Sequence, residues 1–187
     1  MGESGTVWVD DHFVGGHVAL DFCNTVYRRT PVLGAELLDS PAAFTQWLDR
    51  VALAPESAGL VDKAALDDAR RLRSGLWHAF DAQRAGERVP HGVLTGVLSH
   101  AYRHSEYVDV DQHGTVTATH LAGATSALAV AALQLLLHPP EPKVRACDGC
   151  GWLFIDTSRG RRRRWCSMKT CGNVHKVARH RAGLTKH

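Results

Sequence analysis

Cys147-Asp148-Gly149-Cys150 and Cys166-Ser167-Met168-Lys169-Thr170-Cys171 are the two stretches that decide the fold of residues 143–187. Fifteen residues separate the two pairs of cysteines, and the second pair is spaced two residues more widely than the first. Four thiols at nearly this spacing are typical of a tetrahedral zinc site. A segment this short buries too little apolar surface to fold by itself, and zinc contributes roughly 10–16 kcal/mol to the folding of such peptides. The sequence therefore predicts one structural Zn²⁺ on Cys147, Cys150, Cys166 and Cys171.

The wide spacing of the second pair is explained if a helix begins near Cys171. Ser167 or Thr170 can cap this helix, and three apolar residues that we expect to face the metal follow at helical spacing, namely Val174, Val177 and Ala178. Upstream, glycines favour a tight turn at the first pair, and residues 152–156 are typical of a strand. A turn, a hairpin and a helix that carries the last ligand together predict a small treble-clef-like zinc finger.

The same segment is strongly basic, whereas the rest of the chain is acidic. Residues 143–187 contain twelve Lys and Arg against two Asp, a net charge of +10, and residues 1–142 have a net charge of −7. A basic segment of this kind is suited to a polyanion, and Arg makes bidentate bonds to phosphate or guanine. We expect arginines on the hairpin to bind phosphates and Trp165 to shield the metal. The predicted nucleic-acid contacts are Arg161, Arg162, Arg163, Arg164, Lys169, Asn173, His175, Lys176, Arg179 and His180.

Residues 1–142 predict a mainly helical body. Ser40-Pro41 and Asp62 are helix starts, and apolar residues at helical spacing follow each of them. A third helix follows Pro90, and alternating residues on either side of 111–114 predict a β-hairpin. Residues 121–137 are almost wholly apolar but too short to span a bilayer, so we expect a buried central helix there.

Two short strands and a small polar group are predicted near the start of the chain. Residues 6–9 are β-prone, and residues 17–22 alternate apolar and polar side chains after a Gly-Gly turn. Asp21 and Asn24 form a possible ligand site, although short polar side chains at a strand end more often cap backbone groups. Cys23 is expected to be a small buried residue and not a nucleophile.

The Pro-rich connector at 139–142 is the predicted domain boundary, because such a stretch is stiff and incompatible with a helix. It separates a regulatory domain at 1–138 from the zinc finger at 143–187. We expect loss of the metal to unfold the finger alone. The predicted fold class is α+β: a predominantly helical N-terminal domain with short strands and a β-hairpin, followed by the four-cysteine finger.

The chain resembles a known bacterial family in two places. The CGNR-type zinc finger is similar in Trp165-Cys166-Ser167-Met168, in Cys171-Gly172-Asn173 and in the basic residues after them, downstream of Cys147 and Cys150. Residues 15–25, Gly-Gly-His to Leu-Asp-Phe-Cys-Asn-Thr, are similar to the opening of the ABATE domain that precedes this finger. The resemblance implies a bacterial stress-related transcription regulator with a DNA-binding finger. It also shows one departure, because Val174 occupies the position of the motif's Arg.

Several functions fit these features, and they differ in the partner. We expect a DNA-binding regulator that is not an enzyme; the alternative is a zinc-stapled module that binds RNA or another protein. His104, Glu106, Cys147 and Cys150 partly match a zinc deaminase pattern. However, a zinc ion held by four thiolates has no open position for water.

The N-terminus lacks a secretory signal, so we expect a cytoplasmic protein in which cysteines bind metal in preference to forming disulfides. Two further roles are open for the body: binding a small-molecule effector, and homodimerisation.

Overall fold

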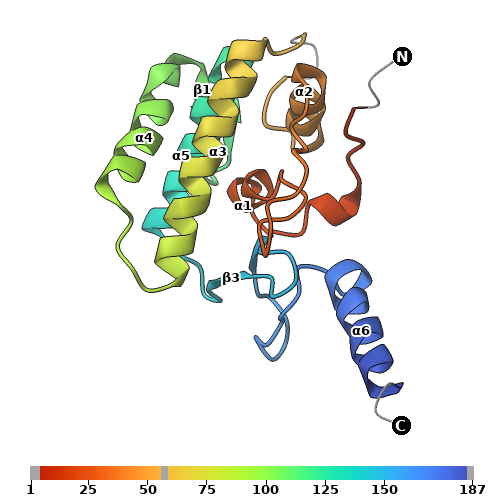
Figure 1. Ribbon diagram of the computed structural model, residues 1–187. Coiled ribbons are helices and arrows are strands. Elements are labelled where there is room, and N and C mark those ends of the chain that lie inside the picture. The colour runs from red at the N-terminus through yellow and green to blue at the C-terminus, as the bar shows by residue number, and fades with distance from the viewer. Residues whose placement is uncertain (1–4, 56–58, 185–187) are drawn as a thin grey trace.

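The computed structural model describes residues 5–55 and 59–184, and one buried helix, α5, lies at its centre. Helices α1, α3 and α4 pack around it, and Figure 1 shows α3, α4 and α5 side by side. The elements in chain order are η1 (Asp10–His12), α1 (Val18–Cys23), α2 (Pro41–Arg50), α3 (Lys63–Arg84), α4 (His91–Arg103), η2 (Ser105–Tyr107), β1 (Val108–Val110), β2 (Val116–Ala118), η3 (Leu121–Gly123), α5 (Ala124–Leu137), β3 (Val144–Ala146), β4 (Leu153–Ile155), η4 (Met168–Gly172) and α6 (Asn173–Leu184).

Helices α2 and α3 begin at the cap residues that the sequence predicts. The Ser40 hydroxyl accepts a hydrogen bond from the Ala43 amide at the start of α2, and the Asp62 carboxylate caps α3 through the Ala65 amide. Gly86, with φ of +79°, follows the end of α3. Helix α5 is apolar on every side, and such a helix is stable only when neighbours cover it. The predicted buried central helix is confirmed.

The predicted hairpin at 107–119 is also confirmed. Strands β1 and β2 pair antiparallel, with Val108 opposite Ala118. The Asp111 carboxylate accepts hydrogen bonds from the amides of His113 and Thr115, which fixes the loop between the strands. The inward face of β2 packs on α5, so the hairpin covers one side of the central helix.

The two strands predicted before residue 23 are wrong. Residues 17–22 lie mostly in helix α1, because the His17 ring accepts a hydrogen bond from the Ala19 amide and caps it. The alternation of apolar residues misled the prediction, since this six-residue helix is buried on nearly all sides and shows no polar face. Residues 6–9 form no strand; the indole N–H of Trp8 instead donates to the Ala43 carbonyl and attaches the segment to α2.

The C-terminal segment consists of a hairpin, a loop and a helix. Strands β3 and β4 pair antiparallel, and Cys147 and Cys150 lie in the turn between them. A loop from residue 156 to 165 leads to Cys166, and the helical turns η4 and α6 follow. The arginine run therefore lies on the loop that follows the hairpin. The prediction that it lies on the hairpin itself is wrong. With the helical body, two short hairpins and a four-cysteine cluster, the predicted fold class is confirmed.

Strand β4 packs into the core of the body. Leu153 is fully buried in the same apolar cluster as α1, α3 and α5. The Asn24 amide donates to the Leu153 carbonyl at 2.9 Å and accepts from the Leu153 amide at 2.8 Å. The Ile155 amide donates to the Gly15 carbonyl, and the Trp152 indole donates to the Val26 carbonyl. The boundary at 139–142 stays a prediction, but the segments on its two sides share one core.

Truncation of Leu153 tests this shared core. We expect Leu153→Ala to lower the free energy of unfolding by about 2–5 kcal/mol, the usual cost of a cavity at a buried leucine. Leu137→Ala is the matched control, since Leu137 in α5 is 70% exposed. Urea unfolding followed by far-UV circular dichroism reports the body helices. If those helices unfold at the wild-type urea concentration in Leu153→Ala, the finger hairpin and the body are separate cooperative units.

Candidate metal centre and basic surface

The four cysteines of the C-terminal segment come together, although they lie up to 24 positions apart in the chain. Their Sγ atoms all lie within 4.8 Å of one another. The Cys150–Cys166 and Cys166–Cys171 Sγ distances are 3.6 and 3.7 Å. A tetrahedron with Zn–S bonds of about 2.3 Å has edges of about 3.8 Å. The thiols are therefore spaced as ligands of a single metal ion, and all five cysteines of the chain are free.

Local backbone geometry positions each pair of thiols. In the β3–β4 turn, the Gly151 amide donates to the Cys147 carbonyl, and Gly151 itself has φ of +75°, which favours glycine. At the second pair, the Ser167 hydroxyl accepts a hydrogen bond from the Lys169 amide and caps η4. Of the two predicted cap residues, Ser167 and Thr170, the structure uses Ser167. η4 is a π-helical turn that carries Cys171. This wider turn accommodates the two extra residues of the second pair.

Apolar side chains from both parts of the chain surround the cysteines. Trp152, Phe154 and Leu37 are buried against them, and Trp8, Val14 and Trp165 pack at the edge of the same cluster. Trp165 thus lies beside the thiols, as predicted, and its ring contacts the His175 ring at a tilt of 36°, with 4.5 Å between centroids. Because Leu37, Trp8 and Val14 come from the N-terminal segment, the body helps to exclude water from the thiols.

The four thiols influence one another's ionisation. Hydrogen bonds donated by Cys150 and Cys166 hold the pKa of Cys147 far below its ordinary value. The Cys147 thiolate in turn raises the pKa of Cys150, and it raises the pKa of Cys166 to about 12. Burial raises the pKa of Cys171. A divalent cation would release the remaining thiol protons on binding, because metal ligands are thiolates.

Asp156 organises the loop that carries the arginines, and the sequence analysis did not select it. This carboxylate is 1% exposed. It accepts hydrogen bonds from the Ser158 amide and hydroxyl, from the Arg163 amide and from the Arg145 guanidinium. These bonds, first of all that from the Ser158 hydroxyl, lower the pKa of Asp156. A single acidic residue just before a run of arginines was the available signal.

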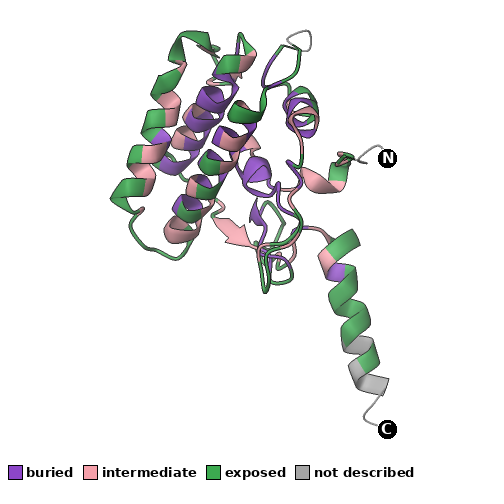
Figure 2. Ribbon diagram, turned by 45° about the horizontal axis from the view of Figure 1, so that its top comes forward, coloured by how far each residue is buried: buried purple, intermediate pink, exposed green. Residues whose placement is uncertain are grey.

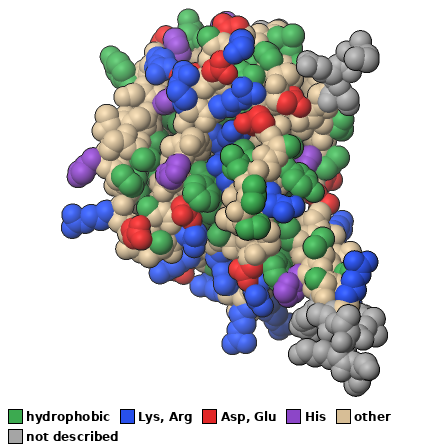
Figure 3. Space-filling view, viewed as in Figure 1, with side chains coloured by type: hydrophobic (Ala, Val, Ile, Leu, Met, Phe, Trp, Pro, Cys, Tyr) green, Lys and Arg blue, Asp and Glu red, His purple; other side chains and the backbone are tan. Residues whose placement is uncertain are grey.

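The arginines of this loop have different roles. The Arg163 guanidinium donates to the Trp165 and Cys166 carbonyls and lies 4.5 Å from the centre of the Phe154 ring, so it is structural. Arg161 pairs with Glu141, and Arg164 pairs with Asp148. Arg162 is exposed, and so is Arg159, which the predicted set of contacts omitted. This loop thus presents several cations at the lower end of the molecule, where Figure 3 shows Lys and Arg side chains together.

Helix α6 is exposed on all of its described sides. Val174 is 71% exposed and Val177 is 40% exposed, and Ala178 is exposed too, so the prediction that these residues face the metal is wrong. The physical reason is that α6 leaves the cluster directly after η4 and projects away from the body (Figure 2). Lys169, Asn173, His175 and Lys176 are exposed as well. The predicted contacts Arg179 and His180 lie on α6, but their side chains are outside the described part of the structure.

The three polar or thiol residues selected in α1 and after it are buried. Asp21 accepts a hydrogen bond from the Gly15 amide at 2.7 Å, and Asn24 binds the backbone of Leu153. Burial raises the pKa of Asp21 to about 6. Cys23 has no exposed surface and burial raises its pKa to about 12, which confirms a small buried residue. Asp21 and Asn24 bind backbone groups, and a ligand site at these two residues stays a prediction.

A cavity in the body lies far along the chain from the cysteines. Its volume is about 490 Å³, and it lies between the start of α3, the end of α4 and η3. Asp68 at its wall accepts hydrogen bonds from Arg71 and Arg103. The predicted effector stays a prediction. Glu106 of the deaminase pattern lies in η2 beside β1, whereas the cysteines follow β3 at the other end of the ribbon in Figure 1.

Comparison with known families assigns both parts of the chain. The CGNR zinc finger family matches residues 143–183, which include the four clustered cysteines. The ABATE family, described as "Putative stress-induced transcription regulator", matches residues 16–139. This match covers more than half of the 187 residues, so the chain belongs to the ABATE family and ends in a CGNR zinc finger. No curated protein matches the chain. Among the helices that the structure describes, none has the length and apolar character needed to cross a membrane.

Removal of one cysteine tests the metal centre and its connection to the body. We expect Cys171→Ser to lose most of its zinc, measured by atomic absorption, because three thiolates and a hydroxyl bind zinc less tightly than four thiolates. Since Leu37, Trp8 and Val14 pack on the cluster, we also expect the thermal midpoint of the whole chain to fall. Cys23→Ala is the control that should retain its zinc. A body that melts at the wild-type temperature in Cys171→Ser would restore the sequence-based expectation of an independent finger.

The raised pKa of Asp21 predicts a pH dependence of stability. The native pKa of about 6 lies above the ordinary value, so the native state holds the proton more tightly than the unfolded chain. The stabilisation of the native state by this proton is fully present below the pKa of Asp21 in the unfolded chain. It is lost as pH rises through the native pKa of about 6. We expect Asp21→Asn to gain about 2–3 kcal/mol relative to wild type between about pH 4 and pH 8. Asp49→Asn, at an exposed position, is the control. Equal pH profiles for wild type and Asp21→Asn would contradict the assignment.

Proposed function

We propose that the protein is a DNA-binding transcription regulator whose DNA-binding surface is the arginine loop together with α6. The observation that carries the proposal is a set of exposed cations on the cysteine-anchored segment. Four of them have no ion pair within the described residues, namely Arg159, Arg162, Lys169 and Lys176. Exposed like charges repel one another, and the folded chain gains no stability from them. A polyanion such as DNA removes that repulsion and releases its own counterions on binding.

The exposure of α6 supports the same proposal. A helix of twelve residues gains too little from intrinsic propensity to be firmly stable in water, and most helices depend on a packed face. The major groove of B-DNA accommodates one helix. On α6 and η4 both cations and apolar side chains are exposed, including Met168 and Val174. Lys and Arg suit phosphates and guanine, while apolar groups suit the methyl group of thymine.

One structural Zn²⁺ on Cys147, Cys150, Cys166 and Cys171 is part of this proposal. When bound, the ion supplies a closed four-thiolate coordination that joins the β3–β4 turn to the start of α6. A closed site of this kind offers no position for a reacting water, and we therefore propose a non-enzymatic role. Four free thiols also require a reducing compartment, which favours the cytoplasm. Membership of the ABATE family, which is described as a stress-induced transcription regulator, supports a regulatory and stress-related role.

Substitution of the unpaired arginines tests the surface. We expect Arg159→Gln with Arg162→Gln to lower affinity for a fluorescein-labelled DNA duplex and to reduce the slope of log K against log salt by about two. Fluorescence anisotropy at several salt concentrations measures both. The control on the body is Arg88→Gln with Lys63→Gln; both residues are exposed, and Lys63 pairs with Asp67. Arg163 is left intact because its guanidinium holds the loop.

The same titrations separate DNA binding from its alternatives. A single-stranded RNA of the same sequence is the competing probe, and it should bind more weakly than the duplex. If the RNA binds more tightly and the duplex slope is unchanged by the two substitutions, the finger is an RNA-binding module. If neither nucleic acid binds at roughly 50–100 mM salt, where nonspecific contacts are normally visible, a protein partner becomes the better explanation of the basic surface.

A further inference from the structure

A loop of the N-terminal segment, residues 27–35, lies directly against the metal-binding turn. Val26 and Glu36 form an isolated antiparallel bridge at its base. Above the bridge the Tyr27 amide donates to the Ala35 carbonyl, and the Gly34 amide donates to the Arg28 carbonyl. The loop is therefore closed like a small hairpin. We call it the 27–35 loop.

Three hydrogen bonds attach this loop and its base to the metal-binding turn. The amides of Arg29 and Thr30 donate to the carbonyl of Cys150 at 2.7 and 3.2 Å. The indole of Trp152 donates to the Val26 carbonyl at 2.6 Å. Gly151 permits this approach, because a Cβ at that position would lie 2.9 Å from the Cβ of Arg29. A segment more than 100 positions before the cysteines is thus part of the surface around them.

The side chains of the 27–35 loop divide into an inner and an outer set. Arg29 points inward, since its guanidinium donates to the Cys23 carbonyl and lies 5.1 Å from the centre of the Trp77 ring. Arg28 is exposed and has no ion pair within the described residues. Large apolar side chains are also exposed: Tyr27 is 58%, Val32 is 72% and Leu33 is 64% exposed. These outer residues contribute nothing to the core of the folded chain.

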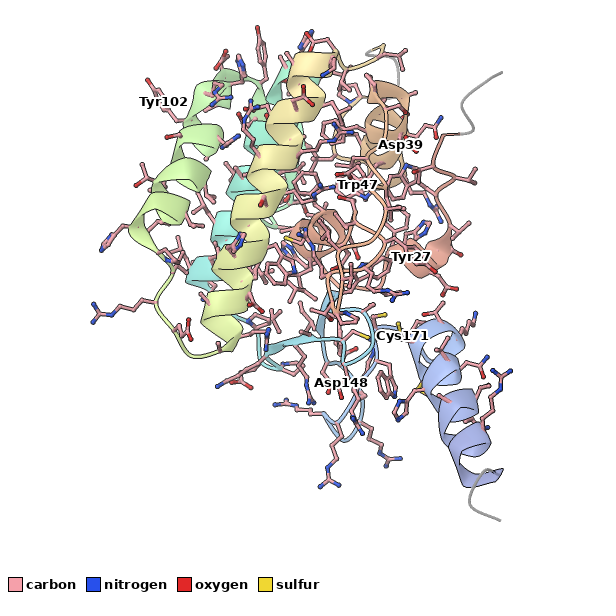
Figure 4. The ribbon with its side chains drawn as sticks, in the orientation of Figure 1. Tyr27, Asp39, Trp47, Tyr102, Asp148 and Cys171 are labelled. Carbon is pink, nitrogen blue, oxygen red and sulfur yellow. The ribbon has the colours of Figure 1, made fainter. Side chains whose placement is uncertain are left out.

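The outer residues of the 27–35 loop add one cation, Arg28, and exposed apolar side chains beside the basic surface of the finger. Cys150 and Cys171 belong to one cluster, so the loop that binds the Cys150 carbonyl lies close to the start of α6. In the view of Figure 4, Tyr27 lies above Cys171 and the start of α6. A neutral apolar tip beside a segment with a net charge of +10 fits a polyanion that also has apolar edges. DNA has both, since sugars and base edges lie between its phosphates.

We propose that the 27–35 loop is a second DNA contact, in which Arg28 binds a phosphate while Val32 and Leu33 enter a groove beside α6. The inference rests on the proposed DNA-binding function and adds a contact from the ABATE segment to it. Apolar wedges of this kind are known at base steps of bent DNA. A second copy of the chain is disfavoured as the occupant, because a two-fold interface would place this basic surface against itself.

The test uses the full-length, zinc-loaded chain and the labelled duplex described above. We expect Arg28→Gln to reduce the salt slope by about one, because it removes one phosphate contact. Val32→Ser with Leu33→Ser should weaken binding at least about fivefold and leave the slope unchanged, since it removes apolar area only. Matched controls on the body are Arg88→Gln, and Leu98→Ser with Tyr102→Ser on α4, all at exposed residues. Zinc content and thermal midpoint should equal those of wild type in every variant.

The outcomes separate this inference from the proposed function. If wild type does not bind the duplex, the proposed function fails and the inference fails with it. A second outcome is that wild type binds the duplex and that Arg159→Gln with Arg162→Gln weakens this binding, while the loop variants bind like their controls. That outcome overturns the loop inference alone. It is also overturned if Val32→Ser with Leu33→Ser leaves DNA binding unchanged. In that case sedimentation velocity and binding to phosphatidylserine vesicles would reveal whether a second copy or an anionic membrane occupies the loop.

Discussion

The hydrogen bonds between the Asn24 amide and the backbone of Leu153 are the constraint on which the rest of the structure depends. Both bonds are buried, and Asn24 is 1% exposed. A buried amide that loses such partners costs about 1–3 kcal/mol, so β4 is fixed at this position beside α1. Because β4 follows the Cys147–Cys150 turn, the body determines where the first pair of thiols lies. The metal centre is thus built on the core of the ABATE segment.

The charged residues of the finger show how stability and binding are divided. Asp156 is buried and satisfied by four donors, and Arg163 packs on Phe154 while donating to two carbonyls. These groups hold the loop. The neighbouring Arg159 and Arg162 are exposed and have no ion pair within the described residues. A run of arginines in the sequence is therefore not one functional unit, and its members have to be separated by their contacts.

The sequence predicted most of the helical body because its signals are local. Ser40, Asp62 and Gly86 act within one turn of a helix end, and the apolar stretch before residue 138 has to be covered by neighbouring elements on every side. The prediction failed at residues 17–22, where burial on nearly all sides removes the difference between a helix and a strand. It failed again at Val174 and Val177, since helical spacing defines a face but not what that face meets.

By itself the sequence determined helices α2 to α6, the hairpin at 107–119 and the four thiols that gather into one cluster. Cap residues, turn residues and cysteine spacing act through contacts a few positions apart, so they can be recognised without a fold. Only the tertiary structure decided that β4 enters the core of the body, that α6 stands exposed and that the 27–35 loop borders the metal-binding turn. Those three features depend on contacts between segments as much as 129 positions apart, for which the sequence carries no local signal.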